Sequence, residues 1–136
     1  MTKWAKSLIR ISTFEVETLQ KQLAEVATRR TCAEMRIATL DAEAELERER
    51  ARTDASSNMM LPAYLKGWRV RRDQAVAQLD LVQAEEDGIR DSLSRAFEEL
   101  KKFEHVAKAT QLAKVIADNK REAAQMDEAA LRRVAG

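Results

Sequence analysis

The sequence contains very few of the residues that interrupt helices. Among its 136 residues there are three glycines and one proline, and only 4% of the residues are aromatic. A compact globular domain normally uses more turn-forming residues and more aromatic side chains. Their scarcity argues against a globule, and the chain also has no run of residues that favours strands.

A single cysteine and the lack of a long apolar run restrict the setting of the chain. Cys32 cannot form an internal disulfide, so a reducing cytoplasm is the simplest compartment. The opening segment MTKWAKSLIRISTF is basic, but charged and hydroxyl side chains interrupt its apolar residues, unlike a signal peptide. No stretch reaches the apolar length of a membrane span.

Charged residues, in contrast, are abundant. They make up 35% of the chain, and together with Ala, Leu and Gln they give the composition of long helices and coiled coils. The net charge is only +1, so no global field would attract nucleic acid or an anionic membrane. Any recognition through charge must therefore be local.

Residues that favour turns gather between Thr53 and Pro62. This segment combines Asp, Ser and Asn side chains with the only proline, which suits the first turn of a new helix. We therefore predict a single all-α coiled-coil domain over 1–136. Its first helix covers about 4–54, its bend about 55–61, and its longer second helix about 62–133.

Apolar residues recur at alternating steps of three and four on both sides of this bend, which is the heptad seam of a coiled coil. The first seam contains Ile9, Val16, Leu19, Leu23, Val26, Ala33, Ile37, Leu40 and Ala44. The second contains Leu65, Trp68, Ala75, Leu79, Val82, Ile89, Leu93, Ala96, Leu100, Phe103 and Ala107. A short connection makes neighbouring helices antiparallel, so the pattern predicts an antiparallel coiled-coil hairpin.

Polar residues within the seam indicate how the two helices are aligned. If the bend is centred near Met59, Glu47 faces Arg72, and Arg30 lies one layer from Glu86. Pairs of opposite charge in a seam specify a register more than they stabilise it, because burying charge costs much of what pairing returns. The charged exceptions to the seam therefore favour this register.

The same alignment leaves the end of the second helix without a partner helix. It places Trp4 opposite Val115, so the residues from about 116 onward have nothing to face within the chain. At 1.5 Å per residue, the roughly 20 unpaired residues would extend about 30 Å. The two arms of the hairpin are therefore predicted to be unequal.

No motif in the sequence indicates catalysis, a cofactor or a metal site. There is no Gly-rich phosphate loop, zinc-type Cys/His cluster or nucleophile elbow, so we expect neither an enzyme nor a small-molecule substrate. His105 and Cys32 fall at outward heptad positions, where solvated, inert side chains are expected. Arginines lie three residues after Glu45 and Glu47, which predicts an ion-paired helix face and not a metal site.

The basic run from Tyr64 to Arg72 is the one segment that resembles a nucleic-acid site. However, Trp68 and Arg72 are seam positions, and acidic residues 43–49 face this stretch in the predicted hairpin. Structural charge pairing is therefore the favoured interpretation, and nucleic acid is not an expected partner.

Apolar residues outside the seam are the candidates for function, because a lone hairpin cannot bury them. Most lie near the two termini: Trp4, Leu8, Ile11, Leu112, Val115, Ile116, Met126 and Leu131. A second group at the bend consists of Met59, Met60 and Tyr64, and Met-rich surfaces adapt readily to partners. Self-packing or dimerisation is the alternative explanation for the terminal group.

Three segments resemble a known family, the flagellar type III export protein FliJ and its injectisome relatives of the YscO type. The first runs from Leu8 through Leu23 to Glu25, the second from Leu93 to Glu104, and the third from Met126 to Arg133. Their order and the matching chain length carry the resemblance, which covers nearly the whole chain. The charged face at 41–50 and the methionines of the bend match no motif of the family.

The resemblance implies a soluble accessory rod similar to the central γ stalk of rotary ATPases. It implies three partners, namely the hexameric export ATPase at the end that carries both termini, the export gate membrane protein, and substrate-specific export chaperones. It also implies a cytoplasmic location, peripheral at the inner membrane export apparatus. The alternative is a generic dimeric coiled-coil scaffold or chaperone unrelated to export.

Overall fold

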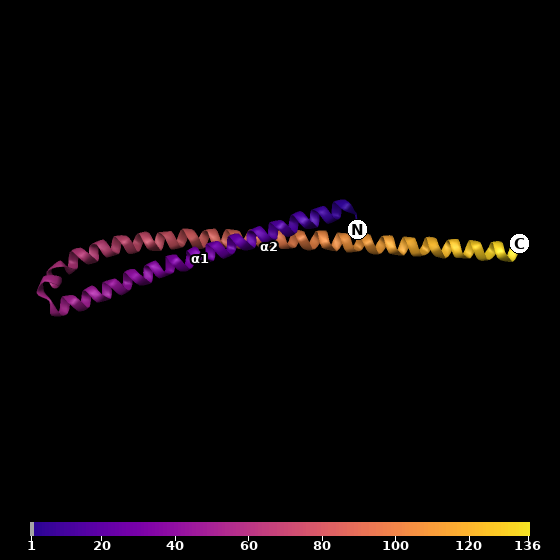
Figure 1. Ribbon diagram of the computed structural model, residues 1–136. Helices are drawn as coiled ribbons and strands as arrows, with labels where there is room; N and C mark the ends of the chain where they lie inside the picture. Colours follow the sequence, from indigo (N-terminus) through magenta and orange to yellow (C-terminus); the bar gives the residue numbers. More distant parts are fainter. Residues whose placement is uncertain (1) are drawn as a thin grey trace. The chain divides into compact units, whose positions relative to one another are not determined.

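The structure, a computed structural model, describes residues 2–136 and consists of two long helices (Figure 1). Helix α1 spans Lys3–Thr53 and helix α2 spans Ala55–Ala135. The predicted antiparallel hairpin of two helices, the second longer than the first, is confirmed. Its contacts form two compact units: one is Thr18–Leu93, and the other combines Ser94–Gly136 with the residues up to Glu17.

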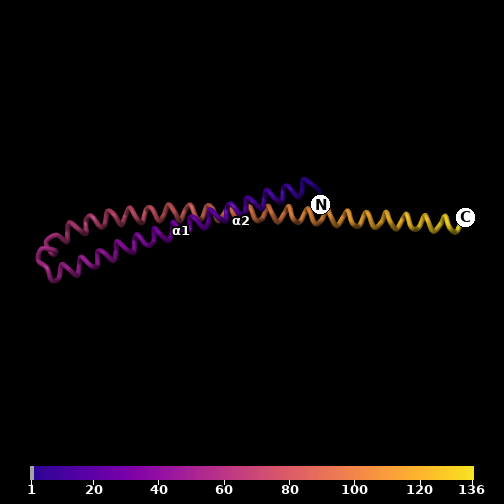
Figure 2. Tube along the Cα trace, in the orientation of Figure 1, coloured from indigo at the N-terminus to yellow at the C-terminus, as the bar shows by residue number. Residues whose placement is uncertain are grey.

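The Cα trace reverses direction between α1 and α2 (Figure 2). Asp54 is the residue that joins the two helices. Its backbone N–H donates to the Arg50 carbonyl at 2.9 Å, which completes the last turn of α1. Its carboxylate accepts hydrogen bonds from the Ser56 N–H at 3.3 Å and the Ser57 hydroxyl at 2.7 Å. Asp54 therefore ends one helix and serves as the N-cap of the next.

The structure differs from the sequence-based bend, because residues 55–61 are helical and lie in α2. Two of the polar side chains that resemble a turn in the sequence, Asp54 and Asn58, instead satisfy helix ends. The Asn58 amide donates to the Ala51 carbonyl at 3.1 Å, near the end of α1. Pro62 lies inside α2, two turns after its start. The predicted proline-led start at about 62 is therefore corrected to Ala55.

The buried residues occupy positions of the predicted heptad seam or of its continuation in the same heptad. In the unit of residues 18–93 the buried residues are Val26, Leu40, Ala44, Ala51, Val82 and Glu86. In the other unit they are Ala5, Ser12, Val16, Ala96, Leu100 and Ala107. Half of these twelve residues are Ala or Ser, so the two helices can approach closely while long side chains at the edges cover the seam.

The register within the seam differs from the predicted one by about one heptad. In the unit of residues 18–93, Arg72 pairs with Asp41 at 2.8 Å instead of Glu47. The Trp68 indole N–H donates to the Leu40 carbonyl at 3.0 Å. The chain reverses at Asp54, earlier than predicted, and this shifts the facing residues. Sliding by seven residues keeps a opposite d, so the apolar pattern alone could not distinguish the two registers.

Candidate docking surface

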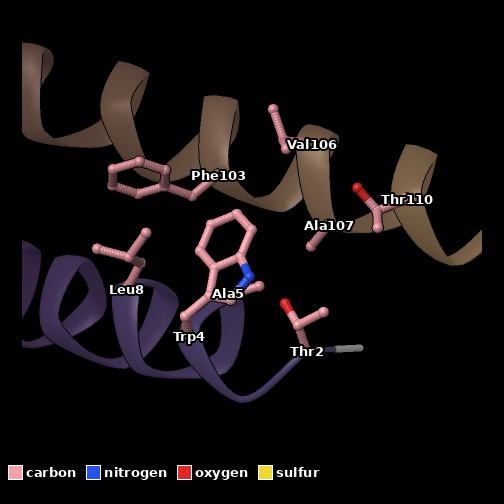
Figure 3. Close-up of a pocket in the computed structure, with 8 residues that line it drawn as sticks. All are labelled: Thr2, Trp4, Ala5, Leu8, Phe103, Val106, Ala107 and Thr110. Atoms are coloured by element: carbon pink, nitrogen blue, oxygen red, sulfur yellow. The ribbon is translucent and has the colours of Figure 1, made fainter.

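An apolar groove lies between the N-terminal end of α1 and the facing part of α2. Its α1 side is formed by Thr2, Trp4, Ala5 and Leu8, and its α2 side by Phe103, Val106, Ala107 and Thr110. Figure 3 shows the Trp4 indole extending from α1 toward Phe103 and Val106 on α2. Trp4 is nevertheless 58% exposed. The groove therefore presents a large aromatic surface to solvent, as docking sites do.

The position of Trp4 corrects the predicted pairing at this end of the molecule. The sequence-based register places Trp4 opposite Val115, whereas Trp4 lines the groove with Phe103 and Val106. This is the one-heptad shift again, within the unit that contains both termini. A longer part of α2 than predicted therefore lacks a facing helix.

A second groove adjoins the first and shares Ala107 with it. It is lined by Ile9, Glu104, Ala107, Lys108, Gln111, Leu112 and Val115. Two of the predicted docking residues, Leu112 and Val115, are therefore brought together with Ile9 of α1. The sequence assigned Ile9 and Phe103 to the seam and did not single out Val106. The sequence does show where the seam ends. Ile9, Phe103 and Val106 lie near that point and could have been identified from it as groove residues.

Beyond these grooves α2 continues without cover. Every residue from 108 to 136 is exposed, including Ile116, Met126 and Leu131 among the predicted docking residues. Val134, which the sequence-based selection missed, is exposed as well and shares a small hollow with Leu131. An uncovered helix of this length has apolar side chains available for another molecule.

The apolar face of this uncovered segment is not a continuation of the seam. Thr110 and Lys114 occupy the next two seam positions after Ala107, while Leu112 and Ile116 lie on a different side of α2. Five residues after Ala107, Leu112 is rotated by about 140° at 3.6 residues per turn. A partner on this face would therefore approach α2 from a direction different from that of α1.

Of the three candidates at the bend, the two methionines are the most accessible. Met59 is 83% exposed and Met60 is also exposed, although both are helical. Tyr64 is half-buried, and the Arg71 guanidinium lies over its ring at 5.8 Å from the centroid. Tyr64 is therefore engaged within α2, whereas the methionines remain accessible.

The most buried charge of the molecule belongs to Glu86. Its side chain accepts hydrogen bonds from Arg30 Nε at 2.7 Å and from Arg90 Nη2 at 2.9 Å. The Arg30 hydrogen bond lowers the pKa of Glu86 and outweighs the opposing effect of desolvation. Arg29 pairs with Glu85 in the neighbouring layer and lowers the pKa of that carboxyl in the same way. The predicted proximity of Arg30 and Glu86 is confirmed, and this layer is structural.

The residues considered for catalysis or metal binding are either exposed or paired with other side chains. His105 and Cys32 are exposed on helix surfaces. Within residues 2–136, no group of His, Cys, Asp and Glu side chains could hold a metal ion. Glu45 and Glu47 pair with Arg48 and Arg50, respectively.

The basic run from Tyr64 to Arg72 is largely occupied by contacts within the hairpin. Arg48 lies over the Trp68 ring at 5.7 Å, Arg72 is bonded to Asp41, and Arg71 covers Tyr64. The aromatic side chains that could stack on bases are thus already covered by arginines. The predicted charge pairing is seen for Arg72, while Lys66 and Arg69 are exposed.

Fold and surface together define a class, an antiparallel helical hairpin with unequal arms and an uncovered apolar end. None of the described helices is long and apolar enough to cross a membrane. The family model described as "Flagellar FliJ protein" matches residues 6–136. Two curated proteins named flagellar FliJ protein, from Caulobacter vibrioides strains NA1000 / CB15N and ATCC 19089 / CIP 103742 / CB 15, are each 53% identical over 135 residues. These matches cover 99% of this chain and 97% of each relative.

The chain therefore belongs to the flagellar FliJ family. The resemblance found in the sequence is confirmed at the level of the family. No solved structure matches the chain significantly.

Proposed function

We propose that this chain is an accessory rod of the flagellar type III export apparatus that binds the hexameric export ATPase through its terminal end. The observation that carries the proposal is the pair of adjoining apolar grooves next to an uncovered stretch of α2. A lone hairpin has no means of burying Trp4, Leu112 and Ile116. Membership of the flagellar FliJ family supports a role for these surfaces in the flagellum.

The mechanism that suits such a surface is differential binding. A rod that contacts some conformations of a ring more favourably than others shifts their populations, and it needs no active site of its own. The uncovered α2 segment from residue 108 onward supplies an elongated contact for a ring. The export gate membrane protein and the substrate-specific chaperones are further proposed partners, with Met59 and Met60 as a second contact. We place the protein in the cytoplasm, peripheral at the inner membrane export apparatus.

The test is a pull-down with the export ATPase, combined with its hydrolysis rate. The variant Trp4→Ser/Leu8→Ser/Ile116→Ser removes apolar side chains from the first groove and the uncovered helix. We expect it to weaken binding by at least tenfold, because each buried apolar side chain contributes roughly 1.5–3 kcal/mol. The stimulation of hydrolysis should fall in parallel.

The matched control is Leu46→Ser/Val70→Ser/Leu81→Ser, which changes three exposed apolar residues in the other unit. Circular dichroism would verify that both variants remain helical. Unchanged ATPase binding by the terminal variant, or equal losses in both variants, would contradict terminal docking. Light scattering would separately reveal a stable dimer, the outcome expected of a generic scaffold.

A further inference from the structure

The first turns of α1 carry two parallel stripes that the ATPase proposal does not use. Ile11 and Phe14 form a short apolar stripe, three residues apart on the side of α1 that faces away from the buried Ala5 and Ser12. Ile11 is 63% exposed and Phe14 is 69% exposed. Ile11 and Phe14 line neither of the two terminal grooves. Their accessible surface therefore lies outside the grooves.

The second stripe is basic and runs beside the first. It consists of Lys3, Lys6 and Arg10, which follow one another at steps of three and four and are exposed. The first acidic residue of the chain is Glu15. Arg29, Arg30 and Arg72 of the other unit each have an acidic partner. No salt bridge to these three cations occurs within residues 2–136.

The compact unit that contains residues 3–14 also has an excess of positive charge. Residues 1–17 and 94–136 contain twelve Lys and Arg residues and nine Asp and Glu residues, a formal charge of +3. Residues 18–93 carry a formal charge of −2. Within the first unit, residues 2–14 contain three basic residues and no acidic one. Such a local field attracts an anionic surface within about a Debye length.

We propose that the outward face of α1 over residues 3–14 binds the surface of an anionic membrane. Ile11 and Phe14 would enter the boundary between headgroups and acyl chains, and Lys3, Lys6 and Arg10 would contact lipid phosphates. A nucleic acid offers phosphates but no apolar layer for this stripe. A protein partner would need a complementary shape, whereas this face outside the grooves suits a flat surface. The inference concerns lipid and is independent of ATPase binding.

The experiment is co-sedimentation of the full chain with vesicles. One set contains phosphatidylcholine alone, and the other also contains roughly one third phosphatidylglycerol, a level of anionic lipid that gives a polybasic segment appreciable attraction. We expect binding to the anionic vesicles only, and we expect it to weaken as salt is raised.

The variant Lys3→Gln/Lys6→Gln/Arg10→Gln should bind about 100-fold more weakly, at about fivefold per basic residue. Ile11→Ser/Phe14→Ser should also bind more weakly, while Lys21→Gln/Lys66→Gln/Arg69→Gln, three exposed basic residues elsewhere, should bind normally.

Several outcomes would overturn the proposal. These are an absence of binding, equal binding to both kinds of vesicle, or an undiminished affinity of the Lys3/Lys6/Arg10 variant. Tight binding to duplex DNA that is lost in the same variant but kept in Ile11→Ser/Phe14→Ser would assign the basic stripe to nucleic acid instead. Circular dichroism of each variant ensures that a loss of binding is not a loss of fold. None of these measurements involves the ATPase, so the failure of one proposal leaves the other intact.

Discussion

At the scale of single residues, Glu86 illustrates how a charge is retained in an apolar seam. The residue is only 7% exposed, and both of its carboxylate oxygens accept hydrogen bonds from arginines. These bonds hold the pKa of Glu86 below the ordinary glutamate value, chiefly through Arg30. A carboxyl whose pKa is lower in the folded state stabilises the fold above its unfolded-state pKa, and it loses that contribution as the pH falls.

We therefore predict that the fold is destabilised by acid as Glu86 becomes protonated. Thermal unfolding measured between neutral pH and pH values below about 4.3, the ordinary pKa of glutamate, should show a falling Tm. Glu86→Gln should lower the Tm at neutral pH, because the charged acceptor is lost. It should also flatten the acid side of the profile. A Glu86→Gln profile parallel to that of the unchanged protein would contradict this assignment.

At the scale of the helices, the hairpin is held by a narrow row of small and medium side chains. Leu40 is the largest of the almost fully buried residues, with 1% exposure, and its carbonyl also accepts the Trp68 indole N–H. Leu40 therefore contributes a side chain to the core and a backbone group to the contact with α2.

Replacing Leu40 by alanine should lower the free energy of unfolding by about 2–5 kcal/mol, because the lost methyl groups leave a poorly filled space. Denaturant unfolding followed by circular dichroism measures this change. The matched control is Leu46→Ala, a leucine of the same helix that is exposed. It should change the free energy by about 0.5 kcal/mol or less. Equal effects of the two substitutions would show that the seam is assigned to the wrong face.

At the scale of the whole molecule, the two arms differ in what they contribute. The seam positions hold the helices together, whereas every residue from 108 onward is exposed. Stability and partner binding should therefore be separable along α2. The uncovered segment is needed for the proposed docking and adds little to the fold of the hairpin.

A chain that ends at Ile116 tests this separation. Because the removed residues are exposed, its free energy of unfolding should stay within about 0.5 kcal/mol of the full chain. Its affinity for the export ATPase should fall if the uncovered helix takes part in docking. Denaturant unfolding and the ATPase pull-down measure the two quantities. A large loss of stability would show that residues 117–136 pack against the molecule.

Much of the fold was predictable because it depends on local patterns. The steps of three and four identified the seam that contains Val26, Leu40 and Val82, and the scarcity of glycine and proline predicted long helices. The docking residues Trp4, Leu112 and Ile116 were predicted because each is apolar and lies outside the seam. Their exposure is confirmed, and their binding role stays a proposal.

The sequence by itself determined the class of fold, the identity of the seam and the inequality of the arms, because each follows from the heptad period and the choice of residues. The tertiary structure decided the register, which brings Arg72 to Asp41 and Trp4 to Phe103. A slide of one heptad preserves the apolar pattern, so the register depends on the capping of both helices at Asp54 and on the Arg72–Asp41 and Arg30–Glu86 pairs. The grooves depend on that register, because they form where the facing helices end.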